Sequence, residues 1–378
     1  MKKIFLFVNV DWFFYSHRLP IAKAALNHDI DMTVYTDITD KRRNANLNEI
    51  KVTQSPLSRS SKSPWSILIE FFKLYGLVSK ARPDLLHAVT IKPIILVGLI
   101  SRLTKIPFVA AISGFGPVIN QSNMLSRIRY KFVSMIYKFV LDPKSASVIC
   151  QSENDKSILI SSNICNESKI NMMPGSGVDL QKFTPSIDSN HDRIVLMASR
   201  ILRDKGINEF CYAAKKLGTR DKRNIKFLLA GPIDELSPSA ISEGDLKKIC
   251  IDCDVEYLGD RGDMSDLLAS SSIFVMPSYY PEGIPKVLLE ASACGIPIIT
   301  TDHPGCRDAV IDGKTGLLVK TRNYEEIVNA VSYLFDNPDI MREMGKAGRR
   351  HAEVSFNEKQ IVESHYELYR ALFNHTNI

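Results

Sequence analysis

Short, strongly apolar runs alternate with longer amphipathic stretches along the whole chain. In the first half, the runs KIFLFVNV, DMTVYT, DLLHAVT, FVAAIS and SVICQS are typical of buried strands. RIVLMASR, IKFLLAG, VEYLG, IFVMPS and PIITT follow the same pattern in the second half. Segments of helical spacing lie between the runs, and two of them, INEFCYAAKKLG and PKVLLEASACG, end in glycine. Alternating strands and helices predict parallel sheets, and two successive sets predict two doubly wound α/β units.

A stretch rich in Pro, Gly, Ser, Asn and Asp separates the two sets, PGSGVDLQKFTPSIDSNHDR at 174–193. We therefore expect an N-terminal domain over 1–185 and a C-terminal domain over 186–355. An amphipathic tail helix at 356–378 is expected to return to the N-terminal domain. Neither half holds the spaced Gly-x-Gly-x-x-Gly of a dinucleotide binder, so NAD or FAD is not expected.

Composition and charge narrow the class of protein. With 45% hydrophobic residues, seven cysteines in no framework spacing and no apolar run long enough to span a bilayer, the chain is expected to be cytoplasmic. Residues 1–185 carry 24 Lys and Arg against 13 Asp and Glu, a net +11, whereas the rest carries 24 against 29, a net −5. The basic half could face nucleic acid, an anionic membrane or a phosphorylated acceptor. No nucleic-acid recognition motif accompanies it.

The densest chemical signal lies at SYYPEGIPKVLLEASACG, after an expected strand end. Pro285 suits the first position of a helix, which leaves backbone N–H groups around Gly283, Ile284 and Lys286 to bind an anion. Glu282 in the loop and Glu290 in the helix could accept hydrogen bonds from sugar hydroxyls. Gly305, in the next turn, could come close to the same ligand.

A second phosphate element, SRILRDKG, directly follows the first strand of the second half. Arg200 and Lys205 flank a short loop at the carboxyl end of that strand, where α/β proteins bind ligands. Two cations there can hold a diphosphate and stabilise it as a leaving group. The sequence shows no clustered Asp pair suited to a divalent ion, so neither a metal nor another cofactor is expected.

These motifs, together with TDHPGCRDAV, DGKTGLLV and SGVDLQKFTP, closely resemble family-4 glycosyltransferases of GT-B architecture. The likeness covers essentially the whole chain and implies two Rossmann-like domains that face a central cleft. The forms PGCRD and DWFFYSHRLP are most similar to bacterial enzymes that build surface polysaccharide, such as capsule or lipopolysaccharide, on a polyprenyl carrier. The resemblance implies a retaining transfer from a nucleoside-diphosphate sugar, expected to be a UDP-sugar, with an N-acetylhexosamine as the sugar that the subgroup suggests.

The resemblance also implies roles for individual residues. Arg200 and Lys205 would hold the diphosphate, Glu282 would contact the donor sugar and Glu290 the ribose. The backbone from Gly283 to Val287, including Pro285 and Lys286, would contact sugar and phosphate. The base would lie near YLGDRG, beside Leu258 and Arg261. Many relatives also carry a histidine after the strand equivalent to FVAAIS, but here that turn holds Gly114 and Gly116; His87, with Lys92 nearby, is a candidate substitute or a hydrogen-bonded strand residue.

The turn DWFFYSHRLP, after the first strand, has aromatics where a glycine loop is often found. With the phosphates bound in the second domain, Trp12 is free to stack on a sugar or prenyl chain, and His17 and Arg18 could meet an acceptor diphosphate. The alternative is that part of the turn packs beneath the next helix. We expect both roles along it.

Two segments of the basic half, 63–83 and 126–139, combine apolar and basic residues. Each taken alone is expected to pack in the domain, but the charge of the whole domain favours peripheral association with the inner face of the plasma membrane. The leading hypothesis is thus a transferase that acts on a polyprenyl-diphosphate-linked acceptor. The alternatives are a UDP-sugar 2-epimerase of GT-B architecture and a non-catalytic protein that binds nucleotide sugars or lipids.

Overall fold

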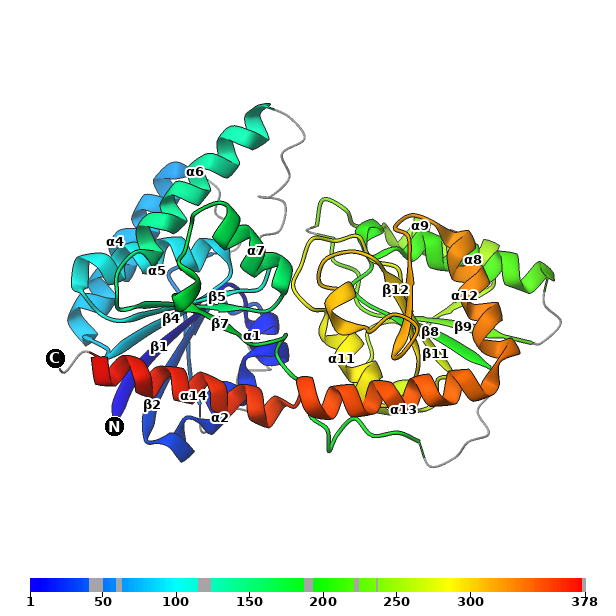
Figure 1. Ribbon diagram of the computed structural model, residues 1–378. Helices are drawn as coiled ribbons and strands as arrows, with labels where there is room; N and C mark the ends of the chain where they lie inside the picture. The colour runs from blue at the N-terminus through cyan, green and yellow to red at the C-terminus, as the bar shows by residue number, and fades with distance from the viewer. Residues whose placement is uncertain are drawn as a thin grey trace. The chain divides into compact units, whose positions relative to one another are not determined.

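The structure is a computed structural model that describes residues 1–40, 50–58, 63–114, 124–186, 193–220, 224–235 and 237–375. The chain forms two compact units (Figure 1). Unit 1 comprises Met1–Ser176 and Lys359–Ile378, and unit 2 comprises Gly177–Glu358. The division therefore falls between Ser176 and Gly177, inside the predicted linker stretch and earlier than position 185.

Unit 1 is built on a parallel sheet whose described strands have the order β3-β2-β1-β4-β5-β6-β7. The strands are β1 (Lys2–Val8), β2 (Ile30–Thr36), β3 (Lys51–Gln54), β4 (Leu85–Val89), β5 (Phe108–Ile112), β6 (Ala146–Cys150) and β7 (Ile170–Met172). The helices are α1 (Asp11–His17), α2 (Leu19–Ala24), α4 (Pro64–Ala81), α5 (Ile91–Thr104), α6 (Met124–Leu141), α7 (Glu153–Ser161) and α14 (Glu358–His375), with 3-10 turns η1 (Leu26–His28) and η3 (Glu167–Lys169).

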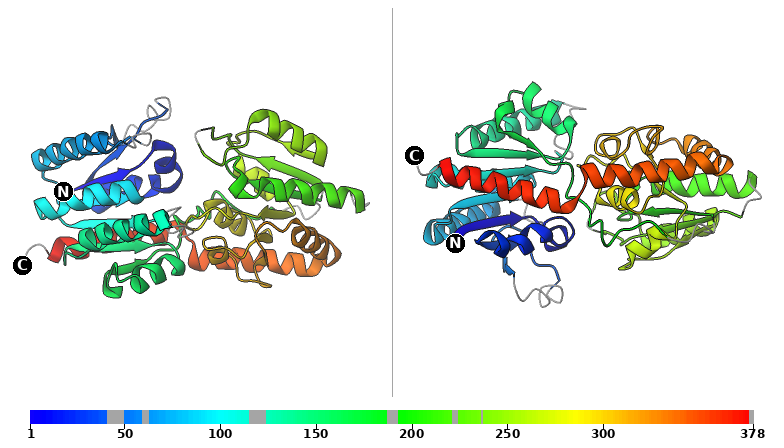
Figure 2. Two further views of the ribbon diagram at one scale, coloured as in Figure 1. Left: turned by 90° about the horizontal axis from the view of Figure 1, so that it is seen from above. Right: turned by 60° about the horizontal axis from the view of Figure 1, so that its bottom comes forward.

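The two faces of this sheet have separate cores, because successive strand residues point to opposite sides. Phe5 and Phe7 of β1 pack with buried residues of α4, α5 and α6. Ile4 and Leu6 pack on the other face with α1, α2 and α14 (Figures 1 and 2). Because helices cover both faces, the central strands are apolar throughout, which is the pattern that makes them recognisable in the sequence.

Unit 2 repeats the plan with a parallel sheet in the order β10-β9-β8-β11-β12-β13 over its described residues. Its strands are β8 (Ile194–Ala198), β9 (Lys226–Ala230), β10 (Val255–Tyr257), β11 (Ile273–Met276), β12 (Ile298–Thr301) and β13 (Gly316–Val319). The helices are α8 (Ile207–Arg220), α9 (Glu243–Cys253), α10 (Met264–Ala269), α11 (Lys286–Ala293), α12 (Tyr324–Asp336) and α13 (Pro338–Ser355), with 3-10 turns η4 (Arg203–Lys205) and η5 (Arg307–Ala309).

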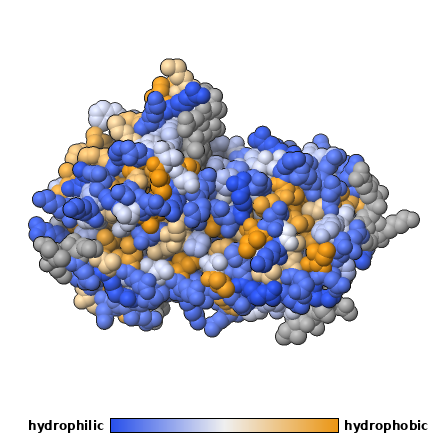
Figure 3. Space-filling model, viewed as in Figure 1, coloured by the Kyte–Doolittle hydropathy of each residue, from blue (hydrophilic) through white to orange (hydrophobic). Residues whose placement is uncertain are grey.

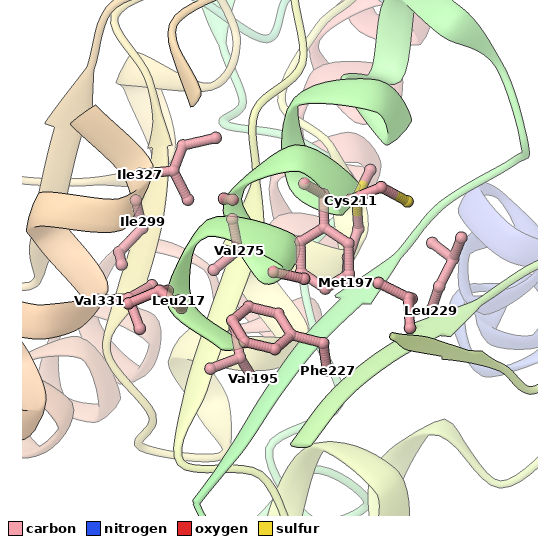
Figure 4. Packing of buried hydrophobic residues seen from close by; sticks show 14 of the residues in the cluster. Val195, Met197, Cys211, Leu217, Phe227, Leu229, Val275, Ile299, Ile327 and Val331 are labelled. Atoms are coloured by element: carbon pink, nitrogen blue, oxygen red, sulfur yellow. The ribbon is translucent and has the colours of Figure 1, made fainter. Parts of the chain in front are cut away.

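One core of unit 2 lies between its sheet and helices α8, α9 and α12 (Figure 4). Val195, Phe227 and Val275 from three strands meet Leu217 of α8 and Val331 of α12 there. Cys250 and Cys253, the only CxxC pair of the sequence, are buried in this core as free thiols. The prediction of two doubly wound α/β units is thus confirmed.

Candidate active site

The candidate site of unit 2 lies where the strand order reverses. β8 and β11 are neighbours in the sheet, but β8 connects onward to β9 on one side and β11 to β12 on the other. In open α/β sheets ligands bind outside the carboxyl ends of the strands at such a point. The segment Ser199–Gly206 follows β8, and the segment Pro277–Pro285 follows β11. The two predicted phosphate elements are therefore adjacent, although about 80 residues separate them in the sequence.

Lys205 and Glu282 form an ion pair between these two segments. Lys205 is only 4% exposed, and the Glu282 side chain is partly open to solvent. The Tyr280 ring lies 5.2 Å from the Lys205 ammonium group and 5.8 Å from the Arg200 guanidinium carbon. An aromatic face beside two cations holds both charges in place.

Arg200 is anchored by Asp234, which follows β9. Its Nη1 donates a 2.8 Å hydrogen bond to Oδ2 of Asp234, and the guanidinium group keeps partial exposure. A guanidinium group carries its N–H donors in a planar fork, which is the geometry that binds a phosphate through two hydrogen bonds. Arg200 and Lys205 thus place two cations at the end of β8, as the sequence predicts.

Two glycines let the loops of the site pack backbone against backbone. Gly206 has φ +84, and a Cβ there would lie 2.3 Å from the carbonyl oxygen of Pro277. Gly305 has φ +86, and a Cβ would lie 2.5 Å from the carbonyl oxygen of Gly283 and 2.6 Å from that of Glu282. Any larger residue at either position would displace the loop that carries Glu282.

The helix after Glu282 begins one residue later than the sequence suggested. Pro285 is the N-cap, with extended ψ of 124°, and α11 begins at Lys286. The backbone N–H groups of Lys286 and Val287 therefore lie in the first turn of α11, where N–H groups have no acceptor within the helix. The buried residues Gly283 and Ile284 precede this turn. One turn into α11, burial raises the pKa of Glu290, although Lys286 and Lys182 oppose the shift.

The predicted base-binding segment lies at the edge of the same sheet. Leu258 N donates to Leu229 O at 2.8 Å, and the Tyr257 hydroxyl donates to Gly231 O at 2.7 Å, so the segment is fixed to the end of β9. The Arg261 guanidinium pairs with Asp263 two residues on. The backbone of this segment is thus positioned by the sheet, whereas Arg261 already has a carboxylate partner.

Unit 1 has its own reversal of strand order, between β1 and β4. The aromatic turn becomes α1, where Trp12 and His17 are half-buried. His17 stacks on Phe13 with ring centroids 4.2 Å apart, and its Nδ1 lies 2.5 Å from the Ser16 hydroxyl. The side chains of these two predicted acceptor-side residues therefore remain partly exposed to solvent near the end of β1.

Three other predicted acceptor-side residues are buried or paired within unit 1. Arg18 is 1% exposed and His87 is 0% exposed, because α14 covers this face of the sheet. His87 Nδ1 lies 2.7 Å from the Tyr369 hydroxyl, so it is the hydrogen-bonded strand residue of the two interpretations. Lys92 pairs at 2.7 Å with the buried Glu70 of α4. None of the three offers an open charge to an acceptor.

The glycine turn after β5 is described only in part. Gly114 has φ +91, a conformation that favours glycine. Gly116 lies outside the described residues.

Asp11, Asp234 and Tyr280 are site residues that sequence reasoning missed. Asp11 accepts hydrogen bonds from Thr39 N, Thr39 Oγ1 and Asp40 N at 2.6–2.9 Å, which ties the aromatic turn to the loop after β2. Burial opposes the change, but these hydrogen bonds lower the pKa of the Asp11 carboxyl. The sequence feature that could have identified Asp11 is its place as an acidic residue directly after the apolar run KIFLFVNV. The feature that could have identified Tyr280 is its place in SYYPEG, two residues before Glu282.

The described residues hold neither a candidate metal centre nor a candidate membrane span. There is no group of three or more His, Cys, Asp or Glu side chains there with the spacing of metal ligands. None of the described helices combines the length and apolar character needed to cross a bilayer.

Two doubly wound units, one of them with a cationic site at its switch point, form the architecture seen in GT-B glycosyltransferases. Residues 181–351 match the family model for glycosyl transferases group 1, and residues 3–152 match the model for glycosyl transferase 4-like proteins. The chain belongs to this glycosyltransferase family and is an enzyme of that class.

Two curated relatives resemble the chain over most of its length. One is the N,N'-diacetylbacillosaminyl-diphospho-undecaprenol α-1,3-N-acetylgalactosaminyltransferase of Campylobacter jejuni, 30% identical over 94% of this chain and 95% of its own. The other is the UDP-Gal:α-D-GlcNAc-diphosphoundecaprenol α-1,3-galactosyltransferase of Escherichia coli, 27% identical over 78% of this chain and 77% of its own.

Solved structures share the fold at lower identity. A glycosyltransferase from Rickettsia africae superposes with a TM-score of 0.80 at 19% identity and covers 98% of both chains. Anabaena HepE in complex with UDP gives 0.77 at 18% identity, over 98% of this chain and 100% of its own. Both confirm the GT-B architecture.

Proposed function

We propose that the protein is a retaining glycosyltransferase that moves a sugar from a UDP-sugar to a saccharide linked to polyprenyl diphosphate. The likeness to the Campylobacter jejuni relative over 94% of the chain carries this proposal, because that relative's name gives a diphospho-undecaprenol acceptor. The Escherichia coli relative's name adds a UDP-Gal donor and the same class of lipid. Both names specify α linkages, which retention produces from an α-linked nucleotide sugar.

The cations of unit 2 supply the stabilisation that such a transfer needs. The bond between the sugar's anomeric carbon and the diphosphate breaks as the acceptor oxygen bonds to the same carbon. Negative charge then grows on the diphosphate, which takes the proton of the acceptor hydroxyl. Arg200 and Lys205, together with the N-terminus of α11, are fixed before the reaction begins and so stabilise that charge without rearranging.

The two glutamates would hold the donor rather than react with it. Glu282, paired with Lys205, would accept hydrogen bonds from the sugar hydroxyls and keep the anomeric carbon beside the diphosphate. Glu290 would bind the ribose hydroxyls, and the backbone near Leu258 would bind the base. On the acceptor side, Trp12 and His17 are the residues of unit 1 that retain surface for a sugar or prenyl chain.

The direct test offers purified protein a panel of UDP-sugars with a short-chain polyprenyl-diphosphate-linked saccharide. We expect a product one sugar heavier by mass spectrometry, with an N-acetylhexosamine as the best donor, and loss of product in Lys205→Met. A thermal-shift series of UDP and GDP tests the nucleotide, since a bound ligand raises the unfolding midpoint. Formation of an epimer from a UDP-sugar alone would instead support a 2-epimerase.

We also propose that the transfer requires no metal. The argument is that Arg200 and Lys205 already provide the positive charge that a divalent cation would give to the departing diphosphate. Product formation should continue at an unchanged rate in excess EDTA. A rate that falls in EDTA and returns with Mg²⁺ or Mn²⁺ would contradict this part of the proposal.

The finer proposal on location is that unit 1 docks on an anionic membrane through α4 and α6. Both helices pack on α5 through one side and leave a second apolar side exposed. We name the exposed apolar residues of the two helices the α4–α6 face. They are Trp65, Leu68, Ile69, Phe72 and Tyr75 of α4, and Met124, Leu125, Ile128, Phe132, Met135 and Phe139 of α6.

Basic residues accompany the α4–α6 face and argue for lipid over another apolar partner. Lys73 and Lys80 are exposed on α4, and Arg127, Arg129, Lys131 and Lys138 are exposed on α6. Hydrophobic residues gather among hydrophilic ones over these helices in the space-filling view (Figure 3). Basic side chains beside an apolar stripe suit an anionic interface, where each cation adds about 1 kcal/mol.

Vesicle sedimentation tests this surface. We expect the wild type to bind vesicles with phosphatidylglycerol and to bind phosphatidylcholine vesicles far less. Phe72→Glu with Phe132→Glu should abolish sedimentation, because both side chains are exposed and neither belongs to the core. Ile251→Glu is the control, since Ile251 is also an exposed apolar residue but lies on unit 2. Equal loss in the control would contradict the assignment.

A further inference from the structure

A buried cluster of polar residues lies beneath α14 in unit 1. It comprises Arg18 from the turn after α1, His87 from β4, and His365 and Tyr369 from α14. Arg18 and His365 are each 1% exposed, and the other two are 0% exposed. The ring centroid of His87 lies 5.9 Å from that of His365 and 5.8 Å from that of Tyr369.

The hydrogen bonds of this cluster are incomplete among the described residues. Arg18 Nη1 donates to His17 O at 3.3 Å, but its Nε and Nη2 have no partner there. His87 Nδ1 meets the Tyr369 hydroxyl at 2.7 Å, and His365 Nδ1 donates to Ile361 O at 2.7 Å. The Nε2 atoms of both histidines are buried without a partner in the described structure. Four buried polar atoms are thus unsatisfied in one place.

The charge of the cluster is also uncompensated. Burial lowers the pKa of Arg18 to about 10, so its guanidinium group still carries a full charge at neutral pH. Two other cations of the described structure have carboxylate partners: Lys92 pairs with the buried Glu70, and the buried Lys205 pairs with Glu282. No described carboxylate pairs with Arg18. A buried cation without a counter-charge costs several kcal/mol, and neutral water would complete hydrogen bonds without supplying that charge.

We propose that Arg18, His87 and His365 form a buried site for a small monovalent inorganic anion, of the size of a halide. The Nε–H and Nη2–H groups of Arg18 donate to it. His87 adds Nε2–H when its Nδ1 accepts from the Tyr369 hydroxyl. The enclosure of all four side chains favours a compact anion over a lipid headgroup or a nucleotide phosphate.

The anion would also help to hold α14 on unit 1. His365 and Tyr369 belong to α14, whereas Arg18 and His87 belong to the body of the unit, so a bound anion bridges the two. Because Nδ1 of His365 already donates, a proton taken up at Nε2 would add another donor toward the anion. Because burial and the charge of Arg18 lower the pKa of His365 to about 3, the ring takes up that proton only well below neutral pH, and occupancy is expected to change little between pH 8 and pH 6.

Thermal unfolding in sodium chloride and in sodium gluconate of equal ionic strength tests the site. In the wild type, we expect the midpoint to rise with the logarithm of chloride concentration and to stay level in gluconate. Arg18→Met should remove the chloride-specific rise. Arg370→Met is the matched control, because it removes an exposed arginine of α14, and it should keep the rise. Equal midpoints in the two salts would overturn the proposal.

Bromide soaked into wild-type crystals gives a second measurement that does not depend on a variant that folds. We expect an anomalous peak within hydrogen-bond distance of Arg18 Nε and Nη2. Electron density for water alone at this position, without anomalous signal, would overturn the proposal even if chloride stabilised the protein elsewhere.

Discussion

Lys205 shows how one residue combines a structural and a functional requirement. Its ammonium group is nearly buried and pairs with Glu282 from a distant loop. Sequence reasoning placed Glu282 in a loop outside the core, which predicts little effect of its removal on stability. The ion pair changes that expectation, because removing one partner of a buried pair leaves the other charge uncompensated.

Glu282→Ala should therefore lower the free energy of unfolding by about 2 kcal/mol as well as abolish most transfer. UDP should raise the unfolding midpoint more in this variant than in the wild type, because its diphosphate would replace the lost carboxylate beside Lys205. Calorimetry with and without UDP measures both effects. Glu256→Ala, an exposed change in the same unit, is the control and should alter neither quantity. An unchanged midpoint for Glu282→Ala would show that Lys205 needs no partner.

Gly305→Ala tests the backbone contact that fixes the Glu282 loop. Its Cβ would meet the carbonyl oxygens of Glu282 and Gly283, so we expect the KM for the donor to rise and the protein to lose stability. Gly313→Ala is a matched control, because Gly313 also has positive φ, at +69, but open space around it. The control should lose about 1 kcal/mol from backbone strain alone and keep its KM. Equal KM values in the two variants would contradict a role for the contact.

At the scale of elements, short edge strands were the hardest to predict. The buried strands β1, β4, β5 and β8 are apolar on both faces and stand out in the sequence. β3 (KVTQ) and β7 (INM) are short and lack fully buried residues, so no apolar run marks them. Such strands are held by pairing with a neighbour, which the sequence does not display.

The docking of α14 should depend on pH. Burial and then the charge of Arg18 lower the pKa of His365 to about 3, and burial, His365 and Arg18 lower that of His87. Both rings are thus neutral in the folded protein, whereas they ionise near pH 6.5 when unfolded. Their contribution to stability is complete above pH 6.5 and is lost as the pH falls from 6.5 toward 3.

We expect the unfolding midpoint of the wild type in gluconate to fall between pH 7.5 and pH 5, where each histidine forfeits about 2 kcal/mol. His365→Asn should show a smaller fall, because one of the two groups is gone. His303→Asn, which changes a partly exposed histidine of unit 2, should keep the wild-type dependence. A full pH dependence in His365→Asn would exclude this origin.

At the scale of the whole molecule, charge is divided between the two halves. The net +11 of residues 1–185 and the net −5 of the rest indicate that attraction to an anionic surface acts through the N-terminal half. Because exposed charges are screened by salt, we expect binding to phosphatidylglycerol vesicles to weaken as sodium gluconate rises from about 0.05 to 0.5 M. The residual binding at high salt then measures the apolar part of the α4–α6 face. Salt-independent binding would contradict the electrostatic part.

The sequence by itself determined the class of fold, the family and the elements that carry the donor site. Apolar strands alternate with helices in two sets, and the motifs around Arg200, Lys205 and Glu282 are local in the chain, so they can be recognised without a structure. The same local reasoning placed Arg18, His87 and Lys92 on the acceptor side, because each follows or lies in a strand of the first half.

Only the tertiary structure decided which of these residues face solvent and which are paired. Burial depends on what packs above a residue, and α14, which covers Arg18 and His87, lies more than 270 residues further along the chain. Pairing depends on the order of strands in the sheet, which brings Glu282 to Lys205 and Asp234 to Arg200. Such long-range contacts leave no periodic pattern in the sequence. They make the difference between the partly exposed donor site of unit 2 and the buried cationic cluster of unit 1.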